Sequence, residues 1–69
     1  MIYPYKEYTP EIHPTAFVAD NATITGDVVI GEQSSIWFSV VIRGDVAPTR
    51  IGNRVNIQDL SCLHQSPNK

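Results

Sequence analysis

An aliphatic residue recurs at every sixth position along most of this 69-residue chain, and this spacing limits the folds open to it. The series runs through Ile12, Val18, Ile24, Ile30, Ile36 and Ile42, and resumes as Ile51, Ile57 and Leu63. The step from Ile42 to Ile51 is nine residues instead of six, so three residues are inserted into one hexad. A period of six fits neither a helix nor a plain alternating strand. Hexapeptide repeats predict a parallel β-helix.

Three hexads make one triangular coil of 18 residues, so the chain is expected to form about three coils. The aliphatic residues of the series are expected to point inward, one per face of the triangle in each coil. Face one begins with Ile12, Ile30 and Ile51, face two with Val18, Ile36 and Ile57, and face three with Ile24, Ile42 and Leu63. The predicted fold class is therefore all-β, with the inserted residues forming a bulging corner loop around Pro48.

The two ends of the chain differ from the repeats. Residues 1–11 carry three tyrosines and two prolines outside the hexad register, and we expect them to form an extended lead-in that caps the first coil. Residues 12–69 hold the coils. The last coil would expose unpaired backbone groups, and the polar segment 65–69 contains no recognisable cap. We therefore expect the β-helix to continue beyond this chain.

Composition excludes several classes of protein. Charged residues make up 17% of the chain and the net formal charge is −2, which argues against a nucleic-acid partner. No apolar run approaches the roughly 20 residues of a membrane span. The N-terminus lacks a signal-peptide pattern, and the single cysteine, Cys62, cannot form an internal disulfide. The expected location is the cytoplasm.

The coil repeat also predicts which outward side chains lie above one another. His64 should stand above Arg43, Gln58 above Trp37, and Asp59 above Phe38. Apolar and ionisable groups on the same outer surface suggest a contact between subunits. Arg43 and Asp59 are a candidate ion pair, either at a solvated surface or across such a contact.

Few residues offer chemistry by themselves. His64 is the best candidate for a metal ligand, although a single imidazole taken alone is more often an ordinary outward side chain. His13 lies in the first coil on a different face and is interpreted as a surface residue. Cys62 has no evident basic neighbour in the sequence to activate it, so it is interpreted as inert.

One combination of motifs is more specific. Arg43-Gly44-Asp45, followed by Ile51-Gly52-Asn53-Arg54-Val55-Asn56-Ile57-Gln58-Asp59 and then by His64, resembles the γ-class carbonic anhydrase family. The resemblance extends from about Ile12 to Lys69. It implies a left-handed parallel β-helix, a homotrimer, and metal sites between subunits. His64 would then be the first of three ligands to Zn²⁺, or to another divalent ion such as Fe or Co. The other two would come from a His-x4-His pair in a later coil, outside this chain.

The resemblance also implies roles for the neighbouring residues. Gln58 would hydrogen-bond the metal-bound water or the substrate, and Asn56 would support it. Arg43 and Asp59 would pair across the trimer contact, with Asp45 in the same network. The implied reaction is attack of a metal hydroxide on carbon dioxide to give bicarbonate.

Two departures from the family pattern bear on the rate. Val46 stands where studied members carry a glutamate, and residues 65–68 contain no carboxylate. Without these proton shuttles we expect slow hydration, or none that is easily detected. Two alternatives stay open: a hexapeptide-repeat acyltransferase with a histidine as general base, and a non-catalytic trimeric scaffold that binds metal. The sequence after Lys69 would separate them.

Overall fold

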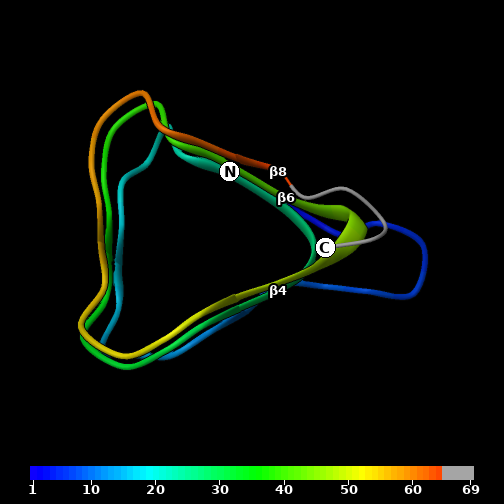
Figure 1. The fold of residues 1–69 in the computed structure, drawn as a ribbon, viewed down its shortest axis with the longest axis horizontal. Helices are drawn as coiled ribbons and strands as arrows, with labels where there is room; N and C mark the ends of the chain where they lie inside the picture. Colours follow the sequence, from blue (N-terminus) through cyan, green and yellow to red (C-terminus); the bar gives the residue numbers. More distant parts are fainter. Residues whose placement is uncertain (65–69) are drawn as a thin grey trace.

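The computed structural model describes residues 1–64 as a triangular prism, which Figure 1 views close to its axis. The side chains of Val46 and His64 lie outside what the structure describes. The chain follows the three sides of the triangle in turn, and each coil lies on the one before it (Figure 1). The fold is a left-handed parallel β-helix, as predicted. Within the described residues there is no helix long and apolar enough to cross a membrane.

Short strands make up the three faces. They are β1 (Ile2–Tyr3), β2 (Glu11–Ile12), β3 (Phe17–Val18), β4 (Thr23–Ile30), β5 (Ser35–Ile36), β6 (Val41–Ile51), β7 (Asn56–Ile57) and β8 (Cys62–His64). Face two is a parallel sheet in the order β3-β5-β7. Faces three and one share a second sheet, in the order β1-β4-β6-β8 with β2 beside β4, because β4 and β6 continue around the corner between these faces.

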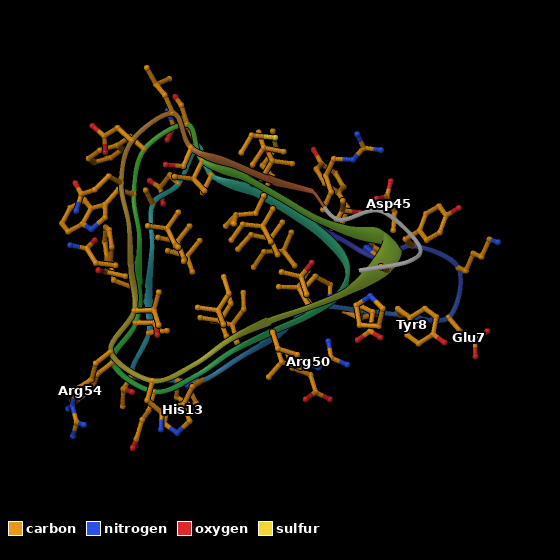
Figure 2. All side chains as sticks on the ribbon, in the orientation of Figure 1. Glu7, Tyr8, His13, Asp45, Arg50 and Arg54 are labelled. Atoms are coloured by element: carbon orange, nitrogen blue, oxygen red, sulfur yellow. The ribbon has the colours of Figure 1, made fainter. Side chains whose placement is uncertain are left out.

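The hexad residues fill the interior of the prism, as Figure 2 shows. Ladder partners confirm the predicted register: Ile24 pairs with Ile42, which in turn pairs with Leu63. Ile24, Ile30, Ile36, Ile42 and Ile51 are buried, while Val18, Ile57 and Leu63 are half-buried and pack against them. Ser34 is a polar exception inside the prism. Its hydroxyl donates to the carbonyl oxygen of Gly52 at 2.6 Å and accepts from the backbone N–H of Val55 at 3.1 Å.

The corners require unusual backbone conformations. Gln33 and Arg54 have φ of 57° and 56° at one stacked corner, and Ser39 and Leu60 have φ of 59° and 65° at the next. These left-handed values are uncommon for residues with a Cβ. The equivalent conformations at equivalent corners let each coil repeat the path of the coil below.

The three inserted residues lie at the corner between faces three and one. Strand β6 pairs with β4 as Gly26–Gly44 before the insertion and as Val28–Thr49 after it, so the register shifts across the bulge. The backbone stays extended through Pro48, and the insertion is therefore an expanded corner of β6 rather than a separate loop. Proline has no backbone N–H to donate to a ladder, and it is tolerated at such a bulge because no ladder hydrogen bond is required there.

The N-terminal residues lie along the lower edge of the first coil. Strand β1 pairs in parallel with β4 through Ile2–Ile24, and β2 pairs with the far end of β4 through Ile12–Ile30. Between them, Tyr5 and Tyr8 exchange backbone hydrogen bonds of 2.8 and 3.0 Å and close a tight turn. The lead-in thus extends two of the three faces downward.

Candidate functional site

Two amide side chains stand next to each other on the outer side of face two. Asn56 lies above Ser35 in the β5–β7 ladder, and the Ser35 hydroxyl donates to its Oδ1 at 3.1 Å. Gln58 lies two residues farther along, above Trp37, whose backbone N–H donates to the carbonyl oxygen of Ile57 at 3.0 Å. Both amides are exposed. They form a polar surface that could hydrogen-bond a small oxygen-containing ligand.

Arg43 and Asp45 form an ion pair within β6. Nη2 of Arg43 lies 2.8 Å from Oδ2 of Asp45, and the exposed fractions of the two side chains are 42% and 17%. The hydrogen bond to Asp45 and the negative charge of this carboxylate raise the pKa of Arg43 above its usual range. Arg43 is therefore a fixed positive charge, and it holds Asp45 at the edge of face three.

Within one chain, the carboxylate of Asp59 bonds to the backbone of Phe38, whereas Arg43 pairs with Asp45. Oδ1 of Asp59 accepts a hydrogen bond of 3.3 Å from the backbone N–H of Phe38, which confirms that Asp59 stands above Phe38. The intrachain partner of Arg43 is Asp45, and Asp59 is not among the described ion pairs of the chain. The expected Arg43–Asp59 pair across a subunit contact stays a prediction.

The backbone of His64 lies next to Arg43 on face three. His64 is the last residue of β8 and pairs with Arg43 of β6, so the predicted stacking of these two positions is confirmed at the backbone. Its imidazole lies outside the described side chains. Cys62 of the same strand pairs with Val41 and is an exposed free thiol. Among the described residues no three His, Cys, Asp or Glu side chains are grouped so that they could hold a metal ion.

A second ion pair, which sequence reasoning missed, clamps the expanded corner. Arg50 Nη2 lies 3.0 Å from Oδ1 of Asp27, and its Nη1 donates to the backbone carbonyl of Asp27 at 3.1 Å. The Thr49 hydroxyl donates to the carbonyl oxygen of Arg43 at 3.3 Å. These bonds fix the insertion that carries Asp45. The three inserted residues shift Arg50 out of the regular six-residue spacing, so a count of hexads does not predict that Arg50 lies near Asp27.

The same corner borders a small cavity. It has a volume of about 190 Å³ and lies between the turn of Tyr5 and Tyr8 and the carboxylates of Asp27 and Asp45. Figure 2 shows Tyr8 and Asp45 at this end of the prism, with Arg50 on the adjoining face. Asp45 thus lies between the Arg43 side of the site and this cavity.

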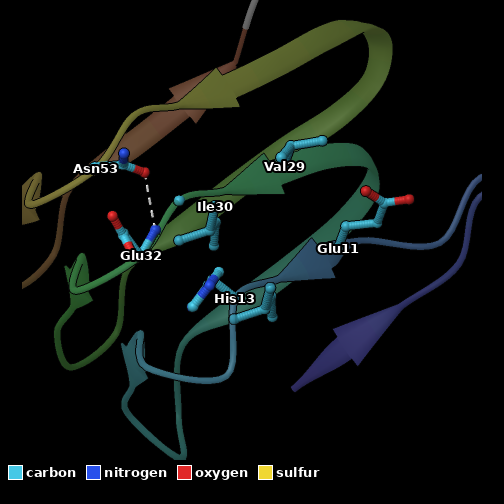
Figure 3. Close-up of a pocket in the computed structure, with 8 residues that line it drawn as sticks. Glu11, His13, Val29, Ile30, Glu32 and Asn53 are labelled. Atoms are coloured by element: carbon cyan, nitrogen blue, oxygen red, sulfur yellow. Dashed lines mark hydrogen bonds between the residues drawn. The ribbon is translucent and has the colours of Figure 1, made fainter.

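A larger depression lies on face one, away from the predicted residues. Its volume is about 490 Å³ and its lining includes Glu11, His13, Glu32 and Asn53 (Figure 3). Here Nδ1 of His13 accepts a hydrogen bond of 3.2 Å from the N–H of Thr15, so in the neutral ring the proton is on Nε2. The Thr15 hydroxyl lies 2.9 Å from the same Nδ1 and accepts from the N–H of Gln33 at 2.9 Å. His13 therefore connects two coils at a corner and has no free lone pair for base catalysis.

Comparison with known proteins shows which proteins the chain resembles. A protein of Bacillus subtilis described as the uncharacterized transferase YtoA is 94% identical over the whole chain, which spans 40% of that protein. A carbonic anhydrase of Geobacillus kaustophilus is 76% identical over 99% of the chain, which spans 37% of it. The mitochondrial gamma carbonic anhydrase 3 of Arabidopsis thaliana is 46% identical over 81% of the chain, which spans 22% of that protein. No family model matches the chain.

The fold agrees with these matches. A solved Bacillus cereus protein, provisionally described as an acetyltransferase, superposes with a TM-score of 0.95 and 67% identity over 97% of this chain and 39% of its own. Over most of its length the chain is therefore similar to proteins named as carbonic anhydrases, including a γ-class member, and to solved proteins described as transferases. It spans less than half the length of the relatives it matches.

These similarities leave the reaction open, because the relatives carry two kinds of name, transferase and carbonic anhydrase. The residues that the γ-carbonic anhydrase resemblance implies fall into two groups. Arg43 and Asp45 of β6 lie with the backbone of His64 of β8 at the end of face three, whereas Asn56, Gln58 and Asp59 follow one another on face two. Within one chain the two groups therefore lie on different faces of the prism.

Proposed function

We propose that this chain contributes to a homotrimeric metalloenzyme that reversibly hydrates carbon dioxide to bicarbonate. The observation that carries the proposal is the ladder pairing of Arg43 with His64, with Asp45 bound to Arg43 from the same strand. This pairing brings the Arg-Gly-Asp motif directly beneath the expected first ligand. A cytoplasmic location is part of the proposal, and the exposed free thiol of Cys62 is consistent with a reducing compartment.

The residues described fit one ligand position of a metal site and not a complete site. His64 would supply an imidazole to Zn²⁺, or to Fe or Co, and the remaining ligands would lie outside residues 1–64. A catalytic zinc site needs three protein ligands, and the chain spans only about two-fifths of its relatives, so such an incomplete set is consistent with the proposal. A bound divalent ion would lower the pKa of its water to about 7 and so supply a hydroxide nucleophile.

The chain's own residues would bind and orient the substrate. The Gln58 amide is exposed and can donate a hydrogen bond to an oxygen of carbon dioxide or bicarbonate. Asn56 is held by Ser35 and limits how far this polar surface can move. Arg43, whose pKa is raised by Asp45, keeps its positive charge throughout the neutral range. That charge favours an anionic product at the mouth of the site.

The trimer contact is proposed to include Trp37, Phe38, Arg43 and Asp59. Phe38 has half of its side chain exposed, and its ring centroid lies 6.1 Å from that of Trp37. Asp59 lies at the edge of this aromatic surface, because its carboxylate accepts from the backbone N–H of Phe38. A surface of this kind is typical of subunit contacts, where a buried apolar centre is combined with arginine at its edge.

The transferase names in the comparisons suggest a second candidate, acyl transfer with a histidine as general base. His13 is unsuited to this role, because its Nδ1 accepts from Thr15 and its Nε2 carries the proton. Of the two histidines of this chain, His64 is therefore the better candidate base. The two functions differ in what His64 does: it is a metal ligand in one and a base in the other.

Stopped-flow hydration of carbon dioxide by the intact protein that contains this chain tests the proposal. The metal-loaded protein should accelerate hydration in concentrated imidazole-type buffer. His64→Ala should remove this activity, and His13→Ala, a matched control on another face, should retain it. Activity that survives in His64→Ala, or no acceleration by the metal-loaded trimer at any buffer concentration, would contradict the proposal.

A further inference from the structure

The indole N–H of Trp37 is buried and has no hydrogen-bond acceptor among the described residues. Trp37 is held in place from two sides: the centroid of its ring lies 4.9 Å from that of Phe17 and 6.1 Å from that of Phe38. Native proteins rarely leave a buried donor unpaired, because the donor has lost its water without gaining a partner. An acceptor for this N–H is therefore expected nearby.

The neighbours of Trp37 differ in their ability to supply that acceptor. Ser35, two residues earlier on the same face, keeps lone pairs that could accept, but its short side chain donates to Asn56 at 3.1 Å and is therefore directed toward that residue. Asp59 also keeps acceptor capacity, but the bond from the backbone N–H of Phe38 to its Oδ1 places its carboxylate over Phe38 and not over Trp37. Gln58 stands directly above Trp37, about 4.8 Å away along the ladder. Its side chain is long and exposed, and its amide has no partner in the described part of the chain.

We infer that Trp37 is a positioning residue, and that its indole N–H donates a hydrogen bond to Oε1 of Gln58. Trp37 and Gln58 directly follow the paired residues Ile36 and Ile57, so their side chains leave adjacent coils at equivalent positions and a rotamer of Gln58 can direct Oε1 toward the indole. The indole fixes which end of the amide points toward the protein. This inference rests on the proposed function for its catalytic meaning, since Gln58 is the residue expected to touch the substrate.

The consequence for the site is chemical. A free glutamine amide can present either its carbonyl oxygen or its NH₂ group to a ligand. With Oε1 bound to Trp37, the NH₂ group is the end that is left to face the site. A hydrogen-bond donor in that position suits an oxygen of carbon dioxide or bicarbonate, whereas a carbonyl oxygen would repel it. Trp37 would therefore select the productive orientation of Gln58.

Indole NMR tests the bond without any assay of activity. In the intact protein with ¹⁵N-labelled tryptophan, the signal lost in Trp37→Phe identifies the Trp37 N–H. Gln58→Met removes the acceptor at similar volume, so this signal should move upfield. Gln58→Glu keeps an acceptor, so the signal should stay downfield. If Gln58→Met leaves the signal unchanged, the acceptor is another group and the inference is wrong.

Hydration kinetics then test the positioning role. Trp37→Phe keeps an aromatic ring and removes only the N–H, so kcat/KM should fall by about two- to ten-fold, the effect of one neutral hydrogen bond. In Gln58→Glu the value of kcat/KM should fall further, although the indole signal is normal, because a carboxylate cannot donate a hydrogen bond to the substrate. Phe17→Leu, which alters the same aromatic cluster, should change kcat/KM less than Trp37→Phe does. An equal loss in Phe17→Leu would show that packing, not the N–H, matters.

A protein without hydration activity that still shows the indole response would contradict the proposed function and leave the bond intact.

Discussion

Gly44 lies directly above Gly26 at the corner where face three turns into face one, and neither position has room for a side chain. A Cβ on Gly44 would come within 2.5 Å of the carbonyl oxygen of Asp27, and a Cβ on Gly26 within 2.7 Å of the Gly44 carbonyl. Gly26 also has a φ of 86°. The backbones of two coils therefore touch at the corner that carries Asp45 and the inserted residues.

Gly44→Ala should destabilise the intact protein by about 1–3 kcal/mol, because the methyl group would force the two coils apart against backbone atoms. Gly52→Ala is the matched control. A Cβ at Gly52 meets nothing nearer than Cγ2 of Val55 at 4.0 Å, so this substitution should be close to neutral. Urea unfolding of both variants measures the difference. Equal stabilities would show that the corner is more open than the structure indicates.

Leu60 combines two unfavourable features at the corner between faces two and three. Its φ is 65° and 79% of its side chain is exposed. Leu60→Gly should therefore stabilise the protein by about 1 kcal/mol, since glycine adopts this conformation without the Cβ clash. Leu63→Asn, three residues later and half-buried against the core, should destabilise it. A loss of stability in Leu60→Gly, measured by thermal unfolding, would mean that the leucine is covered by a contact in the intact protein.

Arg43→Ala should weaken the trimer, because Asp45 loses its ion pair with Arg43 and Asp59 loses its expected partner in the adjacent subunit. Sedimentation at micromolar concentration should show dissociation of the variant. The pKa of Arg43 is raised in the folded protein. The guanidinium is therefore fully protonated at any pH below its ordinary pKa, and it loses its charge only as the pH rises through the raised pKa. The contribution of Arg43 to the trimer should accordingly be constant across neutral pH. A trimer of unchanged strength in Arg43→Ala would exclude Arg43 from the contact.

Val46→Glu should increase the rate of hydration when buffer is dilute. Proton export needs a titratable group near the mouth of the site, and valine cannot provide one. In the unmodified protein the rate should rise with the concentration of an imidazole-type buffer, which replaces the missing shuttle. Stopped-flow assays at several buffer concentrations measure both effects. A fast rate that is independent of buffer would show that another shuttle exists outside residues 1–69.

The hexad spacing predicted the fold because burial at every sixth residue leaves few alternatives. It placed Ile24, Ile42 and Leu63 in one ladder, and the same count brought Gln58 above Trp37. The count failed where the repeat is broken. The three-residue insertion shifts the register, so the Asp27–Arg50 pair could not be derived by adding coils.

Other features depended on side-chain reach rather than on register. Arg43 pairs with Asp45 within its own strand, because an alternation of two puts both side chains on the same side of β6. Spacing favoured Asp59, which in one chain binds the N–H of Phe38 instead. The lead-in also gave no periodic signal, and its pairing through Ile2 with Ile24 came from the structure alone.

Metal content of the purified intact trimer tests the central claim most directly. Elemental analysis should find about one divalent ion per subunit, because each of three equivalent contacts would hold one site. His64→Ala should lose most of that metal, and His13→Ala should keep it, since His13 is engaged with Thr15 at a corner of another face. An unchanged metal content in His64→Ala, in a protein that is still trimeric, would show that His64 is not a ligand and would contradict the account.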